Sequence, residues 1–411
     1  MLARLHAKGF KSLNDLEIHF PRLTVLFGPN AAGKSNILEA AQMLSRIGTS
    51  RTLADAFAGP IRGYPLESFA FPQGGLPALL SKRRARLSLE ADLSVGDERL
   101  RYRSDVEVQP GSGTLSIGHE YLARLTKRGK SRGSPVIEVV GDQVHIRRKG
   151  KAAHPRQEPL GQKHALVSDT RLGDEPYLSV ELARNEFQGW RVYYLDPRVS
   201  MRSARPPAEV EDIGVLGEDI APYLYRLKGE NRRRFEAVRR TLRSLVPSVQ
   251  HLDVDLDEKR GTLDIQVRQD GCDFSSRIIS EGTLRVLALC AIAVNPWAEG
   301  LVAFEEPENG VHPRRLELIA QLLMSLAIDQ GRQVIVTTHS ARFCGAVLRL
   351  TRDRRADLAM LSVRRGPEGT ETEPFGFANG LFQDPQLAAA LSAPSEDGIF
   401  EGLLLRGLLD E

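Results

Sequence analysis

A glycine-rich turn between an apolar strand and a helix constrains this chain more than any other feature. The apolar run Leu23–Phe27 predicts a buried strand, and residues 35–47 carry apolar side chains at a three-to-four spacing that predicts a helix. Between them lies Gly28-Pro-Asn-Ala-Ala-Gly-Lys-Ser35, which fits the pattern G-x-x-x-x-G-K-[ST]. The fold must therefore hold this turn at the carboxyl end of a strand and at the start of a helix.

Each part of this turn is suited to binding phosphate. Glycines let backbone N–H groups turn toward phosphate oxygens, and the start of the helix adds the positive end of its dipole. We expect Lys34 to neutralise the β- and γ-phosphates, and the Ser35 hydroxyl to ligate Mg²⁺. ATP and Mg²⁺ are therefore the expected cofactors. The expected nucleotide-binding residues of the turn are Gly28, Pro29, Asn30, Ala31, Ala32, Gly33, Lys34, Ser35 and Asn36.

Two further strand ends carry the groups that ATP hydrolysis needs, which are carboxylates that hold the metal and orient water. The apolar run 301–304 ends in Glu305 and Glu306, whose side chains should point differently because side chains alternate along a strand. We assign Glu305 to the metal and Glu306 to polarising the attacking water. A second apolar run ends in Thr-Thr-His-Ser, where His339 is expected to reach the γ-phosphate. The expected catalytic residues are therefore Glu306, His339 and Lys34.

Other interpretations of these residues exist. A pair of acids after a strand can simply cap the following helix, and a single histidine at a strand end is usually structural. Both alternatives lose weight beside the phosphate loop in the same chain.

Composition excludes several classes of protein. Of 411 residues, 41% are apolar and 27% are charged, unlike a collagen-like, disordered or disulfide-scaffold chain. Cys272, Cys290 and Cys344 form no CxxC pair, which favours reduced thiols over a zinc site or a disulfide frame. The longest apolar stretch, residues 286–294, is far below the roughly 20 residues of a membrane helix, and the N-terminus has no signal-peptide pattern. We expect a soluble, cytoplasmic protein with no membrane partner.

The formal net charge of +3 is distributed unevenly. Residues 118–165 contain eleven Lys and Arg against four Asp and Glu, a net charge of +7, and a basic cluster at residues 82–86 precedes them. Such a concentration predicts a surface for a polyanion, here DNA or RNA. A solvated β-hairpin surface is the alternative. Few aromatic residues lie among these basic residues, so stacking of single-stranded bases is not indicated.

The order of expected elements predicts an α/β core that is split along the chain. Alternating apolar and polar residues at 86–93, 100–108, 134–140 and 143–147 predict an antiparallel meander, followed by a loop-rich connection over 155–178. Residues 218–246 predict one long helix with an arginine-rich outer face, ended by Pro247. Helices and strands then alternate from residue 281 to residue 364, which favours a doubly wound sheet.

These motifs resemble, in their order, the ABC-type ATPase heads of the RecF, SMC and overcoming-lysogenization-defect group, as a stand-alone ATPase of the AAA_21 type. Residues 9–16 look like the first hairpin of that group, and the loop followed by Asn36 resembles its GPN-x-x-GKSN loop. Residues 279–285, Ile-Ser-Glu-Gly-Thr-Leu-Arg, resemble its signature motif. Residues 305–313 look like its combined Walker B motif and D-loop, and His339 matches its switch histidine.

The resemblance implies a mechanism in which two heads close on two ATP molecules as a homodimer. The signature residues Ser280, Glu281 and Gly282 of one head would then contact the nucleotide held by the other head. Hydrolysis removes the γ-phosphate between the heads and opens the dimer. Taken alone, Ser280 could equally be a helix N-cap.

The chain also departs from the family pattern. Glutamate stands at position 305 where many ABC proteins have aspartate, which puts the geometry of the Mg²⁺ site in doubt. Gln73 is the candidate for the metal-binding glutamine of the Q-loop. No heptad run long enough for an SMC-type coiled coil is present.

The resemblance also implies a division of the chain. We expect residues 1–48 to form the first half of the ATPase core, and 49–195 an antiparallel β subdomain with an inserted basic β-hairpin arm. Residues 196–280 would form a helical lid and a hairpin, 281–370 the second half of the core, and 371–411 a C-terminal tail. A TOPRIM nuclease domain is not expected, because only 71 residues follow Ser340 and Asp353, Asp357 and Asp384 form no DxD cluster.

Two functions remain open at this point. The first is an ATP-gated dimeric switch that clamps or senses nucleic acid and controls a separately encoded effector, a nuclease or toxin, in DNA repair or anti-phage defence. The second is an ATP-dependent switch that holds such a partner inactive without binding nucleic acid. A transporter subunit is disfavoured by the β-rich arm, the Ser-Glu-Gly-Thr signature and the GKSN loop.

Overall fold

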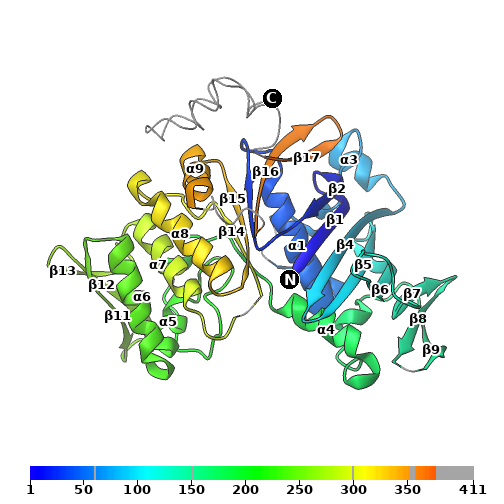
Figure 1. The fold of residues 1–411 in the computed structure, drawn as a ribbon, viewed down its shortest axis with the longest axis horizontal. Coiled ribbons are helices and arrows are strands. Elements are labelled where there is room, and N and C mark those ends of the chain that lie inside the picture. The colour runs from blue at the N-terminus through cyan, green and yellow to red at the C-terminus, as the bar shows by residue number, and fades with distance from the viewer. Residues whose placement is uncertain (60–61, 150, 299, 351–356, 376–411) are drawn as a thin grey trace. The chain divides into compact units, whose positions relative to one another are not determined.

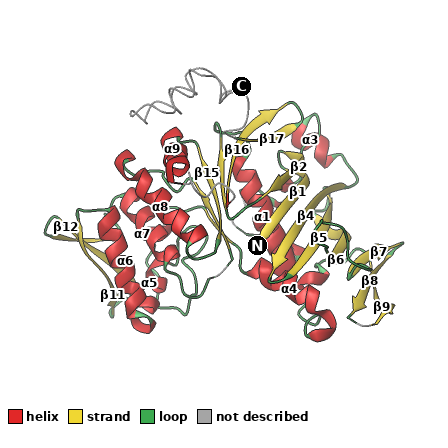
Figure 2. Cartoon of the chain, viewed as in Figure 1, coloured by secondary structure: helices red, strands yellow, loops and turns green. Residues whose placement is uncertain are grey.

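The computed structural model describes residues 1–59, 62–149, 151–298, 300–350 and 357–375 (Figures 1 and 2). The chain forms two compact units. The first unit comprises residues 1–21, 29–190 and 362–373, and the second comprises residues 22–28, 191–361 and, of the described residues, 374–375. The boundary between the units therefore lies inside the phosphate loop, between Gly28 and Pro29.

The first unit is built on an antiparallel sheet in which the strand order is β2-β1-β4-β5-β6-β7-β8-β9. Its strands are β1 (Leu2–Phe10), β2 (Leu13–His19), β4 (Ala85–Val95), β5 (Glu98–Gln109), β6 (Thr114–Arg124), β7 (Ile137–Val140), β8 (Gln143–Arg148) and β9 (Lys151–Pro159). Its helices are α1 (Lys34–Thr49), α2 (Leu53–Phe57), α3 (Gly75–Leu80) and α4 (Leu178–Gln188). Helix α1 packs against α4 and against strands β1 and β4. The antiparallel order of strands β4 to β8 confirms the predicted meander.

The second unit contains a parallel sheet with helices around it. Strands β10 (Arg191–Tyr193), β14 (Leu301–Glu305), β15 (Gln333–Thr338) and β3 (Leu23–Phe27) are parallel neighbours in that order. In the strand order of the six-stranded sheet, β3 is followed by β16 (Leu358–Gly366) and β17 (Gly369–Pro374), of which residues 362–373 are counted with the first unit. A separate sheet consists of β11 (Val249–Asp257), β12 (Thr262–Gln269) and β13 (Cys272–Ser275). The helices are α5 (Ile220–Glu230), α6 (Arg232–Leu245), α7 (Glu281–Ala293), α8 (Leu316–Ile328) and α9 (Ala341–Leu350).

The parallel strands follow from their composition. Residues of β3, β14 and β15 are buried almost without interruption, so these strands appear in the sequence as continuous apolar runs rather than as alternating ones. Glu305, the last residue of β14, pairs with Thr337 of β15. The polar residues that follow these two neighbouring strands therefore emerge at one edge of the sheet.

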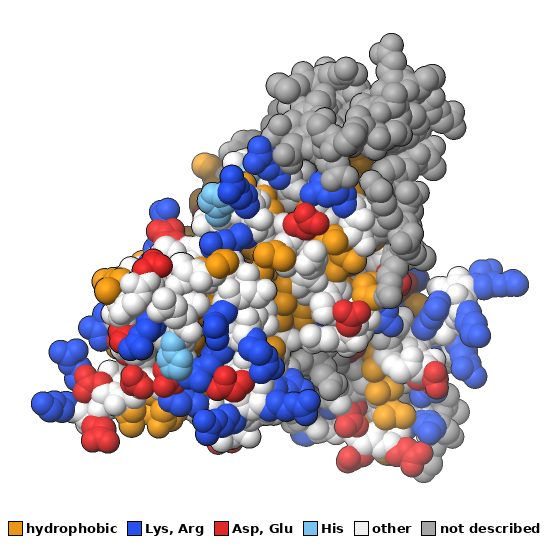
Figure 3. Space-filling view, turned by 60° about the vertical axis from the view of Figure 1, so that its left-hand side comes forward, with side chains coloured by type: hydrophobic (Ala, Val, Ile, Leu, Met, Phe, Trp, Pro, Cys, Tyr) orange, Lys and Arg blue, Asp and Glu red, His pale blue; other side chains and the backbone are white. Residues whose placement is uncertain are grey.

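The long helix predicted over residues 218–246 is wrong in one respect, because the segment forms two helices. Asn231 has φ −143° and ψ 70°, outside the helical region, and its side chain accepts a hydrogen bond from the Arg234 N–H at 3.2 Å. Asparagine is favoured at such a capping position. Part of the arginine-rich face of this segment is neutralised by ion pairs, those of Arg226 with Glu230, Lys228 with Asp253 and Arg239 with Glu236. Figure 3 accordingly shows Lys and Arg interspersed with Asp and Glu on this face of the molecule.

Strand β6 and helix α4 are the longest of the elements that were absent from the sequence-based prediction. Both contain a buried charged residue that breaks the apolar pattern. Glu120 of β6 is 1% exposed, and Arg184 of α4 is 6% exposed and donates to the carbonyl oxygens of Asp169 and Leu172. The loop-rich connection expected over 155–178 is also wrong at its start, where β9 continues to Pro159.

Two further expectations concern membrane-spanning helices and the C-terminal tail. In the part of the chain that the structure describes, no helix combines the length and apolar character that crossing a bilayer requires. The expected tail over 371–411 lies outside the described residues from residue 376 onward, as do Asp353 and Asp384.

The carboxyl group of Glu120, in β6, has a shifted pKa. It is fully buried and accepts hydrogen bonds from the Leu166 N–H at 2.8 Å, the Val167 N–H at 3.0 Å and the Tyr102 hydroxyl at 3.1 Å. Burial raises the pKa of this carboxyl from 4.5 to about 7, although the three hydrogen bonds oppose the shift. Between these two values the unfolded chain releases the proton while the folded chain keeps it.

Replacement of Glu120 by glutamine should therefore change how stability depends on pH. For this group the free energy of unfolding falls as the pH rises from 4.5 to 7, by about 3 kcal/mol at most, because one pKa unit corresponds to about 1.4 kcal/mol. Urea denaturation at pH 5 and pH 8 should show the Glu120→Gln variant losing less stability than the wild type. Asp97→Asn, in the exposed turn after β4, is the control. An equal loss in all three proteins would contradict the prediction.

Candidate nucleotide-binding and hydrolysis site

The phosphate loop adopts the backbone that its glycines permit. Gly28 has φ 151°, Ala31 has φ 65° and Gly33 has φ 106°, all in the region that favours glycine. Gly33 is also the N-cap of α1, and no side chain caps that helix. A helix start with glycine as its N-cap, preceded by a strand and a tight turn, is the arrangement that suits a phosphate group.

Space around Gly33 restricts the position to glycine for a second reason. A Cβ atom there would lie 2.0 Å from Oγ1 of Thr370 and 3.0 Å from Oγ of Ser12. Both residues belong to strands or turns that are distant from the loop in sequence. The loop is therefore held from outside by the first hairpin and by β17.

A chain of hydrogen bonds fixes the loop to these elements. Thr370 Oγ1 donates to the Ala32 carbonyl oxygen at 3.0 Å and lies 2.6 Å from Ser12 Oγ. Because the threonine hydroxyl has one proton, the serine hydroxyl must be the donor in the contact between them. Ser12 Oγ in turn accepts from Asn36 Nδ2 at 2.7 Å. Asn36, expected to bind nucleotide, thus also anchors its own loop.

Lys34 is the first residue of α1 and is 5% exposed. Its ammonium group donates to the Pro29 carbonyl oxygen at 2.8 Å, so the side chain lies back over the loop. Pro29, Asn30 and Ala31 form the exposed tip, whereas Ala32 is buried. The charge of Lys34 therefore lies within the loop, beside the N–H groups that would receive phosphate oxygens.

At the edge of the parallel sheet in the second unit, the structure brings Glu306 and His339 together. Glu306 Oε1 lies 2.9 Å from His339 Nδ1, and Glu306 Oε2 accepts from Asn309 Nδ2 at 2.6 Å. Glu306 has φ 46°, an uncommon backbone conformation for a residue other than glycine. Its own N–H donates to the Thr337 carbonyl oxygen at 3.0 Å. Both oxygens of the carboxylate are thus oriented, and so is its backbone.

A second carboxyl group lies buried behind this pair. Glu308 is 5% exposed, and its Oε1 accepts a hydrogen bond from the Thr338 hydroxyl. Burial raises the pKa of Glu308, and the neighbouring Glu306 adds to the shift. The Thr338–Glu308 hydrogen bond ties the end of β15 to the turn after β14, and Thr338 Oγ1 also accepts from the Ser340 N–H at 2.9 Å.

The signature segment begins helix α7. Ser280 is its N-cap, and Ser280 Oγ accepts from the Thr283 N–H at 3.2 Å, which confirms the capping interpretation of this serine. Glu281 forms an ion pair with Arg198 at 3.1 Å. A Cβ atom on Gly282 would lie 2.1 Å from the Gly310 carbonyl oxygen, so the signature and the D-loop of one chain are in close backbone contact.

The three expected metal ligands come from separate elements of the chain. Ser35 lies in the first turn of α1, and Glu305 is the last residue of β14. Gln73 is in the exposed turn before α3, and none of its side-chain atoms is hydrogen-bonded within the described residues. Those residues contain no cluster of three His, Cys, Asp or Glu side chains that would form a metal site by themselves. A hydroxyl and a carboxylate are each among the oxygen ligands that Mg²⁺ takes in proteins.

Several residues of the site were missed in the sequence analysis. Thr370 and Ser12 hold the loop, Asn309 and Glu308 support the strand ends, and Arg202 donates to the Ile279 carbonyl oxygen at 2.6 Å just before the signature. Glu308 and Asn309 lie inside the recognised Walker B and D-loop segment, so a closer look at that motif would have found them. Nothing in the sequence near Thr370 or Arg202 indicates a role, because both act through distant backbone.

Comparison with known proteins agrees with this geometry. A family model described as "AAA domain, putative AbiEii toxin, Type IV TA system" matches residues 23–344, more than half of the chain. The DNA replication and repair protein RecF of Rippkaea orientalis is 27% identical over 228 residues, which are 50% of this chain and 54% of that protein. The uncharacterized protein YbjD of Escherichia coli is 23% identical over 403 residues, 91% of this chain and 65% of that protein. The chain thus spans about half the length of the RecF relative that it matches.

Among solved structures, the Smc head domain from Pyrococcus furiosus, with an extended coiled coil and bound to the C-terminal domain of ScpA, has a TM-score of 0.50 with this chain. The two are 13% identical, and the match covers 95% of this chain and 99% of that one. At this identity the likeness concerns the fold alone. The predicted α/β fold of an ABC-type ATPase head is confirmed.

Removing the Thr370 hydroxyl should weaken nucleotide binding. Thr370→Val keeps the shape of the side chain but breaks the contact with the Ala32 carbonyl, which leaves the loop less ordered. One such hydrogen bond corresponds to about 1 kcal/mol, so we expect the Kd of a fluorescent ATP analogue to rise about fivefold. Thr372→Val, on the same strand, is the matched control. Equal affinities of the two variants would contradict a role for the hydroxyl.

Proposed function

We propose that this chain, which belongs to the family of AAA domains described as putative AbiEii toxin of type IV TA systems, binds and hydrolyses ATP as a dimeric switch. In this proposal the switch clamps or senses nucleic acid and controls a separately encoded effector in DNA repair or anti-phage defence. The observation that carries the proposal is the Glu306–His339 contact at the ends of neighbouring strands, in a chain whose phosphate loop leads into a helix with Gly33 as its N-cap.

Hydrolysis requires a base that accepts a proton from water, and Glu306 is the proposed base. A carboxylate only accepts hydrogen bonds, so the proton in the 2.9 Å contact belongs to Nδ1 of His339. With Asn309 on its other oxygen, Glu306 keeps one orientation, and such preorganisation lowers the cost of reaching the transition state. His339 is thereby also held at the strand edge, where its second nitrogen is available to face the γ-phosphate.

Lys34, the first turn of α1 and Ser35 are the proposed ligands of ATP and its Mg²⁺, and Glu305 and Gln73 are the proposed further metal ligands. When bound, the metal ion would neutralise charge on the phosphates. The anchoring of the loop through Ser12 and Thr370 supports this assignment, because a preformed loop does not have to be ordered by the nucleotide.

Dimerisation is proposed through the signature segment. Ser280, Glu281 and Gly282 would contact a nucleotide bound to the second copy, with the positive end of the α7 dipole near its γ-phosphate. The close approach of Gly282 to Gly310 supports this part of the proposal. It provides a route by which the loss of the γ-phosphate at the signature would shift the D-loop next to Glu306.

Two observations concern the partner. The basic region 118–165 and the likeness to proteins named for DNA replication and repair favour nucleic acid. The description of the family as a putative toxin favours the second candidate, a switch that holds a toxin or nuclease inactive without nucleic acid. Purification from the native host with and without nuclease treatment distinguishes them, because only a nucleic-acid-mediated association is lost on treatment.

Substitutions in the two halves of the site should have different effects. We expect Lys34→Ala to abolish ATP binding, because the loop loses its cation. Glu306→Gln should retain binding, lower the rate of phosphate release at least about 100-fold, and trap a dimer, because loss of a general base typically costs 10²–10⁴-fold. Phosphate release and light scattering with ATP measure both effects.

Glu317→Gln, on the half-exposed face of α8, is the control for this pair of measurements. It should hydrolyse ATP at the wild-type rate and show no trapped dimer. If the Glu306→Gln variant hydrolyses ATP at the wild-type rate, Glu306 is not the base.

Binding to nucleic acid should depend steeply on salt. Each phosphate that a protein contacts contributes about −0.9 to the slope of log K against log of the salt concentration for duplex DNA. We expect the Glu306→Gln variant with ATP to retard the migration of duplex DNA in a gel at low salt. The variant should release the DNA as the salt concentration is raised. Absence of any shift with DNA or RNA at low salt would overturn the clamp and leave the second candidate.

A further inference from the structure

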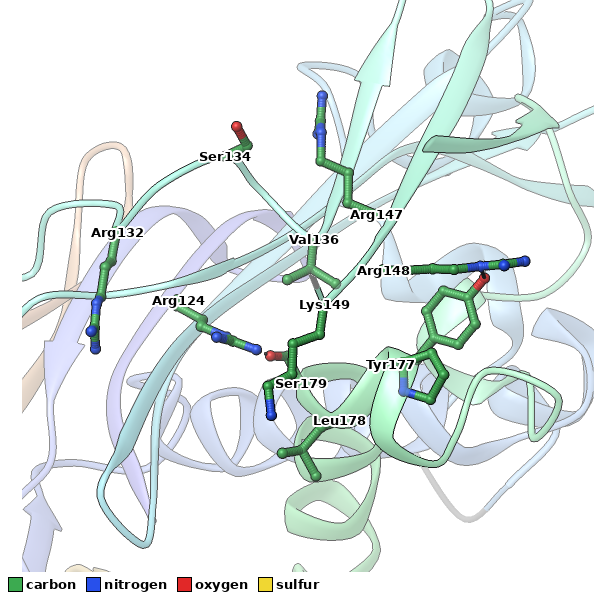
Figure 4. Close-up of a pocket in the computed structure, with 11 residues that line it drawn as sticks. Arg124, Arg132, Ser134, Val136, Arg147, Arg148, Lys149, Tyr177, Leu178 and Ser179 are labelled. Carbon is green, nitrogen blue, oxygen red and sulfur yellow. Dashed lines mark hydrogen bonds between the residues drawn. The ribbon is translucent and has the colours of Figure 1, made fainter. Parts of the chain in front are cut away.

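The basic arm contains a pocket that no part of the ATPase site uses. It has a volume of about 180 Å³ and lies where the end of β6 and the end of β8 meet the start of α4 (Figure 4). All of its lining residues belong to the first unit. Five of them carry a positive charge, namely Arg124, Arg132, Arg147, Arg148 and Lys149.

The carboxylates around the pocket neutralise only part of this charge. Arg147 is paired with Glu138, and Lys149 is paired with Glu175 at 3.1 Å, although the Glu175 side chain is 82% exposed. An ion pair so open to water contributes little. In the described part of the chain, neither Arg124 nor Arg132 has a carboxylate within ion-pair distance. The pocket therefore keeps about three positive charges after both pairs are counted.

The start of α4 adds to the positive field. Pro176, Leu178 and Ser179 line the pocket, and no side chain caps the helix at its N-cap Tyr177. The first-turn N–H groups of α4 thus have no capping acceptor from the cap residue, and the positive end of the helix dipole lies at the pocket. Glu181, the acidic residue of this turn, accepts a hydrogen bond from the Asp174 N–H at 3.0 Å.

Two arginine side chains of the pocket and the backbone of Lys149 are held in place before any ligand arrives. Arg124 Nε donates to Oγ of Ser179, which is 3% exposed, at 2.9 Å. Arg148 Nε donates to the Tyr177 hydroxyl at 3.0 Å, and the Lys149 N–H donates to the Pro176 carbonyl oxygen at 2.9 Å. Figure 4 shows Arg124 and Lys149 both directed toward Ser179. A preorganised set of donors binds an anion without the cost of ordering long side chains.

We infer that this pocket binds the terminal phosphate of a nucleic-acid strand. A phosphomonoester carries nearly two negative charges and three acceptor oxygens, which match the excess charge of the pocket. A backbone phosphate carries one charge and has a sugar on each side, so it suits an open stripe of cations rather than a hollow. A cavity of about 150 Å³ holds one benzene molecule, so this volume admits a phosphoryl group and part of a sugar but no base pair.

The pocket has no means of selecting a base. Tyr177, its aromatic residue, is 8% exposed, and the guanidinium of Arg148 lies over its ring at 5.8 Å. A base would have no open ring face on which to stack. Recognition would therefore depend on the strand end and not on its sequence. This inference rests on the proposed function, because it takes nucleic acid as the ligand of the arm.

Fluorescence anisotropy with two duplexes of one sequence, one with 5′-phosphates and one with 5′-hydroxyl ends, tests the inference. The full-length wild type should bind the phosphorylated duplex about tenfold more tightly, because charge-assisted hydrogen bonds contribute about 1.5–3 kcal/mol. The double variant Arg124→Gln/Arg132→Gln should lose this preference and bind both duplexes alike. Arg128→Gln, an exposed basic residue of the same arm outside the pocket, should keep it.

The outcomes separate this inference from the proposed function. Equal binding of both duplexes by the wild type overturns the terminal-phosphate site and leaves nucleic-acid binding intact, whereas no binding of either duplex overturns both. Ribose 5-phosphate as a competitor identifies the source of the phosphate. Displacement of the phosphorylated duplex by an equimolar amount would assign the pocket to a small phosphorylated ligand and overturn the strand-end inference. Unchanged ATP hydrolysis by the double variant verifies that the variant is folded.

Discussion

The proposed function depends most on the orientation of one carboxylate. Glu306 follows β14 in a left-handed backbone conformation, and its two oxygens contact His339 and Asn309. The strained backbone persists because the Glu306 N–H donates to Thr337 of the adjacent parallel strand, so that the sheet itself fixes the turn. If that turn relaxed, the carboxylate would leave the edge where the switch histidine emerges, and the proposed chemistry would lose its base.

The sequence could predict this pair because parallel strands end at a common edge. Residues that directly follow β14 and β15 must be neighbours once both runs are recognised as buried strands. Thr370 could not be predicted in the same way, since it reaches the phosphate loop from a strand more than 300 residues away. The break at Asn231 and the burial of Glu120 were missed for a related reason, because in both places a polar side chain bonds to backbone that the local pattern does not reveal.

Whether a positive charge in this chain is available to an anion depends on whether a carboxylate already pairs with it. The net charge of the region does not decide this. In the first sheet, Arg4, Arg101 and Arg103 contact Glu90, Asp92 or Asp105, so these positive charges are already neutralised. Arg124 and Arg132 belong to the basic region 118–165, and they line a pocket without such partners among the described residues. The same amino acid thus stabilises a sheet in one place and forms a potential anion site in another. Only the structure separates the two.

A double-mutant cycle tests the central claim most directly. Single-turnover hydrolysis of ATP would be measured for Glu306→Gln, for His339→Ala and for the two substitutions combined. If His339 acts by holding Glu306, the second substitution should cost little once the first is present, and the double variant should be about as slow as Glu306→Gln alone. Effects that multiply in the double variant would show that the two residues act independently, which would contradict the account.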